Sequence, residues 1–148
     1  MSFDPGKLTF LEAAPADAEA LVGLRVEAMR ESLENVGRFD PARARARFLA
    51  TFDPAHTLHI DVAGDRVGFF VAKPGDGELL LDHLYVKPAH QGKGIGGAVL
   101  QHVFAQAASL GMPVRVGALR GSRSNAFYLR HGFIEVAQGE FDIYYVRA

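Results

Sequence analysis

A strand, a glycine-rich turn and a helix follow one another between Leu79 and Leu110, and this succession constrains the fold more than any other stretch. Residues 78–86 form an apolar run that ends before Pro88, because proline pushes the preceding residue toward extended geometry. Beyond the turn, apolar residues recur at helical three- and four-residue steps: Val99, Leu100, Val103, Phe104, Ala107 and Leu110. Such an arrangement aims unpaired main-chain N–H groups and the positive end of a helix at a phosphate. The stretch therefore predicts an anion-binding site.

Two well-known glycine patterns compete for this turn. A P-loop fails, because Lys87 stands where its first glycine belongs and Gly94 stands where its Ser or Thr belongs. The dinucleotide pattern G-x-G-x-x-G is matched by Gly92, Gly94 and Gly97, but it also needs an acidic residue roughly 20 positions further on. No Asp or Glu occurs anywhere in residues 83–134. A nucleotide-dependent oxidoreductase is therefore the weakest of the alternatives.

Two segments together resemble one known family. Residues 91–96, Gln-Gly-Lys-Gly-Ile-Gly, resemble the pyrophosphate motif Gln/Arg-x-x-Gly-x-Gly/Ala of the GCN5-related N-acetyltransferases (GNATs). Residues 124–133, Ser-Asn-Ala-Phe-Tyr-Leu-Arg-His-Gly-Phe, resemble the same family's later motif, a helix with Phe-Tyr followed by Gly-Phe. The two segments have the family's order, and the chain between them has room for one helix and one strand. The pair is specific, whereas either segment alone would be weak evidence.

The resemblance implies roles for individual residues. The main chain at the end of the central strand would contact pantetheine and the thioester carbonyl, and the turn would hold the pyrophosphate. Asn125 would either bind the pantetheine amides or cap the start of the helix that carries the Phe-Tyr motif. The predicted cofactor-binding residues are Leu84, Tyr85, Val86, Gln91, Gly92, Lys93, Gly94, Ile95, Gly96, Gly97 and Asn125.

Three residues are predicted to be catalytic. Tyr128 occupies the position of the family's proton donor, and a phenol with a pKa near 10 can protonate a departing thiolate without being ionised at pH 7. Asp82 and His83 are candidates for the base, and strand alternation sends them to opposite faces. A water chain in place of a side-chain base is left open. Many relatives carry an asparagine seven residues before the tyrosine, where this chain has Gly121, so Asn125 or Ser124 is a candidate substitute.

The order of the elements predicts a single mixed α/β domain over residues 1–148. We expect a first strand at Lys7–Ala13, a helix from residues 14–17 to Gly37, and a second helix from Asp40 to about Thr51. A hairpin about Gly64-Asp65 joins the strands 57–63 and 66–72. Strands at 78–86 and 114–119, a helix from Ser122 or Ser124 to His131, and a hairpin of 133–137 with 140–147 complete it. The resemblance implies a mostly antiparallel sheet flanked by about four helices, with parallel strands 4 and 5 splayed around the cofactor.

Charge is divided unevenly along the chain. Residues 83–134 contain six basic and no acidic residues, while the whole chain has a net charge of −1, so the remainder carries −7. Such a division favours a polyanion such as coenzyme A for the second half and a cationic amine for the first. There is no aromatic-interleaved basic patch that would indicate nucleic acid, no His, Asp and Glu spacing that would indicate a metal, and no apolar run that would span a membrane.

These observations predict an acetyl-CoA-dependent N-acetyltransferase that moves an acetyl group to a small-molecule or peptide amine. The chain has no cysteine, so direct attack in a ternary complex is expected rather than a cysteine-linked acyl intermediate. No signal peptide is seen, so the cytoplasm is the expected location, and a homodimer is possible by analogy with the family. The alternative is a non-catalytic domain that binds or senses acyl-CoA.

Overall fold

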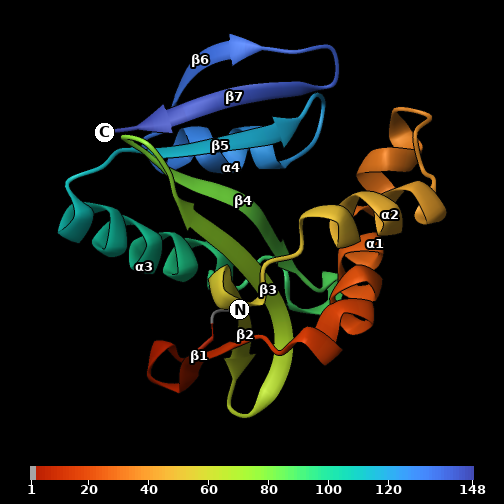
Figure 1. Cartoon of the computed structure of the whole chain (residues 1–148), viewed down its shortest axis with the longest axis horizontal. Coiled ribbons are helices and arrows are strands. Elements are labelled where there is room, and N and C mark those ends of the chain that lie inside the picture. The colour runs from red at the N-terminus through yellow and green to blue at the C-terminus, as the bar shows by residue number, and fades with distance from the viewer. Residues whose placement is uncertain (1–2) are drawn as a thin grey trace. The chain divides into compact units, whose positions relative to one another are not determined.

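Residues 3–148, the part of the chain that the computed structural model describes, contain seven strands, four α-helices and four short 3-10 helices (Figure 1). The strands are β1 (Leu8–Glu12), β2 (Thr57–Val62), β3 (Asp65–Pro74), β4 (Leu79–Val86), β5 (Val114–Leu119), β6 (Ile134–Gln138) and β7 (Asp142–Arg147). The helices are α1 (Ala18–Asn35), α2 (Pro41–Thr51), α3 (Ile95–Leu110) and α4 (Ser124–Arg130). The strand order is β1-β2-β3-β4-β5-β7-β6, with β4 and β5 parallel and the β1–β2, β2–β3, β5–β7 and β6–β7 pairs antiparallel. The predicted mixed, mostly antiparallel sheet with four helices is therefore confirmed.

The chain forms two compact units. The first contains the described residues up to Val71 together with His83–Gly96, and the second contains Ala72–Asp82 together with Gly97–Ala148. Consequently β3, β4 and α3 each contribute residues to both units. Across residues 3–148, none of the helices combines the length and the apolarity needed to cross a lipid bilayer. The single domain over residues 1–148 stays a prediction.

In the first unit, β1, β2 and β3 form an antiparallel meander. The β2–β3 turn lies at Ala63-Gly64, one residue earlier than predicted, and both residues have positive φ angles of 52° and 85°. Positive φ at both central residues is the geometry whose twist matches two antiparallel strands. Asp61 pairs with Arg66 and Ile60 with Gly68, so β3 carries one extra residue between them. This β-bulge kinks β3 just before Gly68.

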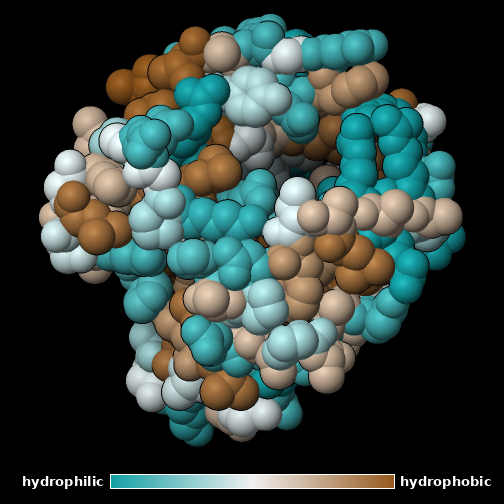
Figure 2. Space-filling model, viewed as in Figure 1, coloured by the Kyte–Doolittle hydropathy of each residue, from teal (hydrophilic) through white to brown (hydrophobic). Residues whose placement is uncertain are grey.

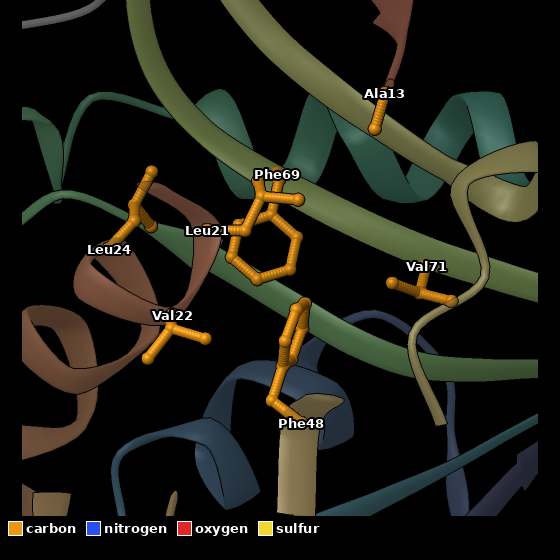
Figure 3. Close-up of a cluster of buried hydrophobic side chains, with 7 residues drawn as sticks. All are labelled: Ala13, Leu21, Val22, Leu24, Phe48, Phe69 and Val71. Atoms are coloured by element: carbon orange, nitrogen blue, oxygen red, sulfur yellow. The ribbon is translucent and has the colours of Figure 1, made fainter. Parts of the chain in front are cut away.

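The helices α1 and α2 are attached to this meander by one hydrophobic cluster. The boundaries of α2 match the prediction. The helix begins at Pro41 because the Asp40 carboxylate caps it by accepting a hydrogen bond from Arg43 N (3.1 Å), and because proline suits the first turn. The rings of Phe48 and Phe69 meet edge to face, with centroids 5.7 Å apart (Figure 3). The cluster consists of Ala13, Leu21, Val22, Leu24, Phe48, Phe69 and Val71. Each fully buried Leu or Phe side chain contributes about 1.5–3 kcal/mol to folding.

The second unit is built on β5. Val114, Arg115 and Val116 pair in parallel with Leu79, Leu80 and Leu81 of β4, as the intervening helix predicts. On its other side β5 pairs with β7 along its full length, and β6 pairs with β7 at the edge of the sheet. The chain after α4 turns at Gly132, whose φ angle is +87°.

The helix predicted after the glycine turn is confirmed as α3, and its apolar residues are buried except at its end. The five from Val99 to Ala107 are no more than 9% exposed, whereas Leu110 in the last helical position is 45% exposed. The edge strand β6 exposes two large apolar side chains, Ile134 and Val136, and apolar residues gather over β6 and β7 on the face shown in Figure 2. Homodimer formation stays a prediction.

A buried histidine links β2 to the start of α1. His59 is 2% exposed, and its Nε2 lies 2.9 Å from the carboxylate of Asp17. The same carboxylate oxygen accepts a hydrogen bond from Ala14 N (2.8 Å). These contacts, the Ala14 N–H first and then His59, hold the pKa of Asp17 below its usual range. The ionised carboxylate therefore stabilises the turn that begins α1.

Replacing Asp17 by Asn tests this charge. A lowered folded-state pKa means that the stabilisation is present above the unfolded value of 3.8 and is lost as the pH falls through the folded value. Asp17→Asn should therefore lower the urea midpoint at pH 7, and its difference from the wild type should shrink below about pH 4. Asp76→Asn, in an exposed turn, is the matched control and should follow the wild type. If the difference in urea midpoint between Asp17→Asn and the wild type stays constant down to acid pH, the charge of Asp17 contributes nothing to stability.

Candidate active site

The glycine-rich turn between β4 and α3 lies in the first unit. Gly92 and Gly94 have φ angles of +76° and +91°, which side-chain-bearing residues rarely adopt. The Gln91 side chain donates a hydrogen bond from Nε2 to the main-chain carbonyl of Val86 (2.9 Å). Gln91 therefore ties the turn back to the last residue of β4 and fixes how the turn leaves the strand.

The turn presents unpaired hydrogen-bond donors. Within residues 3–148, the main-chain N–H groups of Gly92 and Gly94 donate to no protein acceptor. The helix α3 begins directly afterwards at Ile95, so its first N–H groups are also unpaired within the helix. Together with the positive end of the helix they form a site suited to an anion. Lys93 is half-buried in the same turn, and Ile95 is only 2% exposed, so Ile95 offers its main chain rather than its side chain.

Gly97 has a different structural reason for being glycine. A Cβ atom at this position would lie 3.1 Å from His131 Nε2, within the second unit. The His131 ring is held in place because its Nδ1 donates to the carbonyl of Phe127 (2.8 Å). The sequence gives no sign of this packing, and a role of Gly97 in cofactor binding stays a prediction.

The end of β4 passes unusually close to β3. A Cβ atom on Gly68 would lie 2.1 Å from the carbonyl oxygen of Tyr85 and 3.1 Å from the Cα of Val86. In a regular sheet a Cβ points away from the neighbouring backbone, so the backbones of Gly68 and Tyr85 meet in an irregular geometry. After this contact, Lys87 N donates to Val67 O (2.8 Å) and keeps the end of β4 beside β3. The main chain of Leu84, Tyr85 and Val86, predicted to bind the acyl donor, therefore includes the irregular contact at Tyr85.

A chain of three polar side chains lies beside this contact, in the first unit. Arg25 of α1 donates from Nε to the Tyr85 hydroxyl (3.1 Å), and His83 Nδ1 lies 2.8 Å from the same hydroxyl. The Phe48 and Phe69 rings pack against this group, with ring centroids 5.4 Å from His83 and 5.3 Å from Tyr85, respectively. The predicted base candidate His83 thus faces α1 and α2. No pattern in the sequence indicates Arg25, because this residue lies 60 positions from Tyr85 and belongs to no motif.

Asp82, the other predicted base, belongs to the second unit. Its carboxylate is exposed and lies 3.9 Å from Nζ of Lys73 on β3. An ion pair of this length between partly exposed side chains is weak. Asp82 and His83 therefore lie in different surroundings, and the role of either as base stays a prediction.

The second motif lies on α4 in the second unit, where Asn125 makes internal hydrogen bonds. Its Nδ2 donates to the carbonyls of Leu119 (2.9 Å) and Ser122 (3.0 Å), and its Oδ1 accepts from the Tyr145 hydroxyl (2.7 Å). No side chain caps the start of this helix, so Ser122, Ser124 and Asn125 do not act as its cap. The capping alternative for Asn125 is therefore wrong. The side chain of Asn125 joins β5, α4 and β7 instead, and its binding to pantetheine stays a prediction.

Two tyrosines of this unit are buried in an aromatic cluster. Tyr128 is 5% exposed, and its ring packs against Phe127, Phe133 and Tyr145. Burial raises the pKa of Tyr145, and Glu135 adds to the shift. The Tyr145 hydroxyl therefore keeps its proton and donates a hydrogen bond to Asn125 Oδ1. Across the described residues, no group of three or more His, Asp and Glu side chains is placed to hold a metal ion.

Comparison with known proteins identifies the family. The family model for the acetyltransferase (GNAT) domain matches residues 53–135, more than half of the chain. The chain belongs to the GNAT acetyltransferase family. The matched range contains both the glycine turn and the Phe-Tyr motif, so the resemblance expected from these two segments is confirmed. No curated protein matches the sequence significantly.

Solved structures confirm the GNAT fold. The PaiA N-acetyltransferase of Thermoplasma acidophilum, crystallised with coenzyme A, has a TM-score of 0.74 and 17% identity, covering 95% of this chain and 98% of its own. An acetyltransferase of Thermus thermophilus has a TM-score of 0.74 and 20% identity, with coverages of 95% and 96%. A GCN5-related N-acetyltransferase of Rhodopseudomonas palustris has a TM-score of 0.74 and 18% identity, with coverages of 100% and 98%. At 17–20% identity, the similarity of these structures to this chain shows a shared fold.

The close approach at Gly68 leads to a test with an internal control. Gly68→Ala places a methyl group against the Tyr85 carbonyl, so the backbone must shift, and we expect a loss of about 1–3 kcal/mol in the free energy of unfolding. Gly23→Ala, in the middle of α1, meets no atom within 4 Å and should gain about 0.5–1 kcal/mol. Urea unfolding measures both. Equal stability of Gly68→Ala and the wild type would mean that the strand end does not need this glycine.

Proposed function

We propose that this protein is an acetyl-CoA-dependent N-acetyltransferase that moves an acetyl group to a primary amine by direct attack in a ternary complex. Membership of the GNAT family supports acetyl transfer in general. The coenzyme A bound to the PaiA protein of similar fold supports the choice of cosubstrate. The observation that carries the proposal is the pair of unpaired N–H groups at Gly92 and Gly94, at the head of α3.

The turn would hold the pyrophosphate through main-chain donors. Gly92 and Gly94 supply N–H groups, Gln91 keeps the turn attached to β4, and the side chain of Lys93 adds a positive charge. Beyond the turn, the N–H groups of Ile95 and Gly96 would extend the cradle, with Gly96 leaving room for the phosphates to approach. This hydrogen bonding needs no acid nearby, which agrees with the absence of Asp and Glu from residues 83–134.

The end of β4 would position the thioester. A fixed main-chain N–H that points at a developing oxyanion stabilises the transition state by about 3 kcal/mol. The family resemblance implies that the main chain of this strand end contacts the thioester carbonyl, so one main-chain N–H of Leu84, Tyr85 or Val86 is proposed as the oxyanion donor.

Proton transfers complete the reaction. The amine nitrogen forms a bond to the thioester carbon, the carbon–sulfur bond breaks, the nitrogen gives up a proton and the departing thiolate takes one up. His83 is the proposed acceptor of the amine proton, with Asp82 or a water chain as alternatives, and Tyr128 is the proposed donor to the thiolate. The proposal for Tyr128 comes from the family motif. The proposed domain spans residues 1–148, and a cytoplasmic location remains a prediction.

Binding of coenzyme A tests the turn with a matched pair of glycine variants. Gly94 and Gly64 have similar φ angles, +91° and +85°, so replacing either by Ala strains the backbone by about 1–2 kcal/mol. Gly94→Ala should weaken coenzyme A binding at least about tenfold in calorimetry, equivalent to about 1.4 kcal/mol, while Gly64→Ala should bind as the wild type does. Wild-type protein that shows no saturable heat with millimolar coenzyme A would refute the proposed function.

Removal of one hydroxyl tests the proposed acid. Tyr128→Phe should lower kcat with acetyl-CoA and an accepted amine by about 100-fold or more, as expected for the loss of a general acid, and should change coenzyme A affinity little. Tyr144→Phe on β7 is the matched control and should keep the wild-type kcat. Release of free thiol in the presence of a broad amine panel measures the rate. Coenzyme A binding without turnover on any amine would favour the non-catalytic, acyl-CoA-sensing alternative.

A further inference from the structure

Arg25 is a partly buried arginine of the first unit. Its side chain is half-buried, its Nε donates to the Tyr85 hydroxyl, and it has no carboxylate partner within residues 3–148. Of the exposed arginines of the same unit, Arg30 pairs with Glu34, Arg45 with Glu19, and Arg66 with Asp61. Arg43 and Arg47 have no carboxylate partner within residues 3–148 but are exposed to water. A guanidinium partly removed from water without a counter-ion is electrostatically costly. Arg25 has neither full exposure nor a carboxylate, which indicates that its counter-ion is supplied by something that binds.

The geometry of the guanidinium defines what kind of anion fits. Because Nε is occupied by the Tyr85 hydroxyl, the two terminal nitrogens Nη1 and Nη2 remain as a planar pair of donors. Such a pair matches the two oxygens of a carboxylate, which it can bind in a bidentate way. Arg25 also lies over the Tyr85 ring, 5.8 Å from its centroid, and this contact restricts the direction in which the terminal nitrogens point.

The position of Arg25 connects this anion with the proposed chemistry. A guanidinium can only donate, so the Tyr85 oxygen accepts from Arg25, and its second lone pair accepts from His83 Nδ1–H in the tautomer whose Nε2 carries the lone pair of the base. One hydroxyl thus joins Arg25 to the proposed base. The main chain of the same tyrosine belongs to the segment proposed to position the thioester. An anion held by Arg25 would therefore lie about one side chain away from the reacting groups.

We propose that the amine acceptor carries a carboxylate and that Arg25 binds this carboxylate through Nη1 and Nη2, which makes amino acids the substrate class. Arg25 is a specificity-determining residue in this proposal, which rests on the proposed function because it names the acceptor of the same reaction.

Matched acceptors test the carboxylate. L-phenylalanine and phenethylamine, and L-leucine and 3-methylbutylamine, differ only in the carboxylate. With acetyl-CoA and a free-thiol readout, the wild type should show a kcat/KM at least about tenfold higher for each amino acid than for its amine, the preference expected from one bidentate ion pair. Arg25→Gln should abolish this preference by raising KM for the amino acid. The ratio of the two acceptors is compared between proteins, which cancels their intrinsic difference in reactivity.

Two further variants separate charge from geometry. Arg25→Lys keeps the charge but loses the planar pair of donors, so it should restore only part of the preference. Arg47→Gln removes an exposed arginine of α2 and should leave the preference as in the wild type. Melting temperature and coenzyme A affinity of each variant report whether the fold and the cofactor site are intact.

A competition experiment with the wild type keeps the test independent of the variants. 3-Phenylpropionate, which has the carboxylate of phenylalanine but no amine, should inhibit competitively against L-phenylalanine, whereas neutral 3-phenylpropanamide should not. Turnover without preference for the carboxylate, no turnover with any member of this panel, or equal inhibition by acid and amide overturns the inference. If any of these results is found while coenzyme A still binds, the inference about Arg25 is wrong but the proposed cofactor site is not contradicted. If coenzyme A does not bind, both the inference and the proposed function are wrong.

Discussion

The close contact between Gly68 and the Tyr85 carbonyl is the constraint on which the candidate site depends. Only a residue without a Cβ allows the end of β4 to approach β3 so closely, and the β-bulge before Gly68 kinks β3 at that point. The bond from Gln91 to the Val86 carbonyl then attaches the glycine turn to the end of β4. These two contacts together position the start of the glycine turn next to the end of the strand.

The same strand end carries side-chain chemistry on its α1 and α2 side. His83 and Tyr85 point to one face because strand residues two apart share a face, and the helices bring Arg25 and Phe48 to that face. In the proposed function and the further inference, acyl-donor binding would use the main chain of β4 and acceptor recognition its side chains. Such a division would let acceptor preference change by substitution on α1 without disturbing the cofactor turn.

The features that sequence analysis predicted well depend on local rules. The ends of α2 follow from Asp40 and Pro41, the turn at residues 91–94 follows from its glycines, and the buried face of α3 follows from helical spacing. The features that it predicted poorly depend on packing or on turn geometry. Leu110 continues the apolar spacing of α3 and yet is 45% exposed, and α4 starts without a serine cap while Asn125 bonds to two neighbouring strands.

The sequence alone determined the fold class, the glycine turn and the family, because the two GNAT segments lie within short stretches whose spacing can be read directly. Tertiary structure decided the rest of the candidate site. Gly68 matters only because β4 approaches it, and Arg25 matters only because α1 brings it to Tyr85, 60 positions along the chain. Contacts between distant residues depend on how helices and strands pack, and no local pattern of residues encodes that packing.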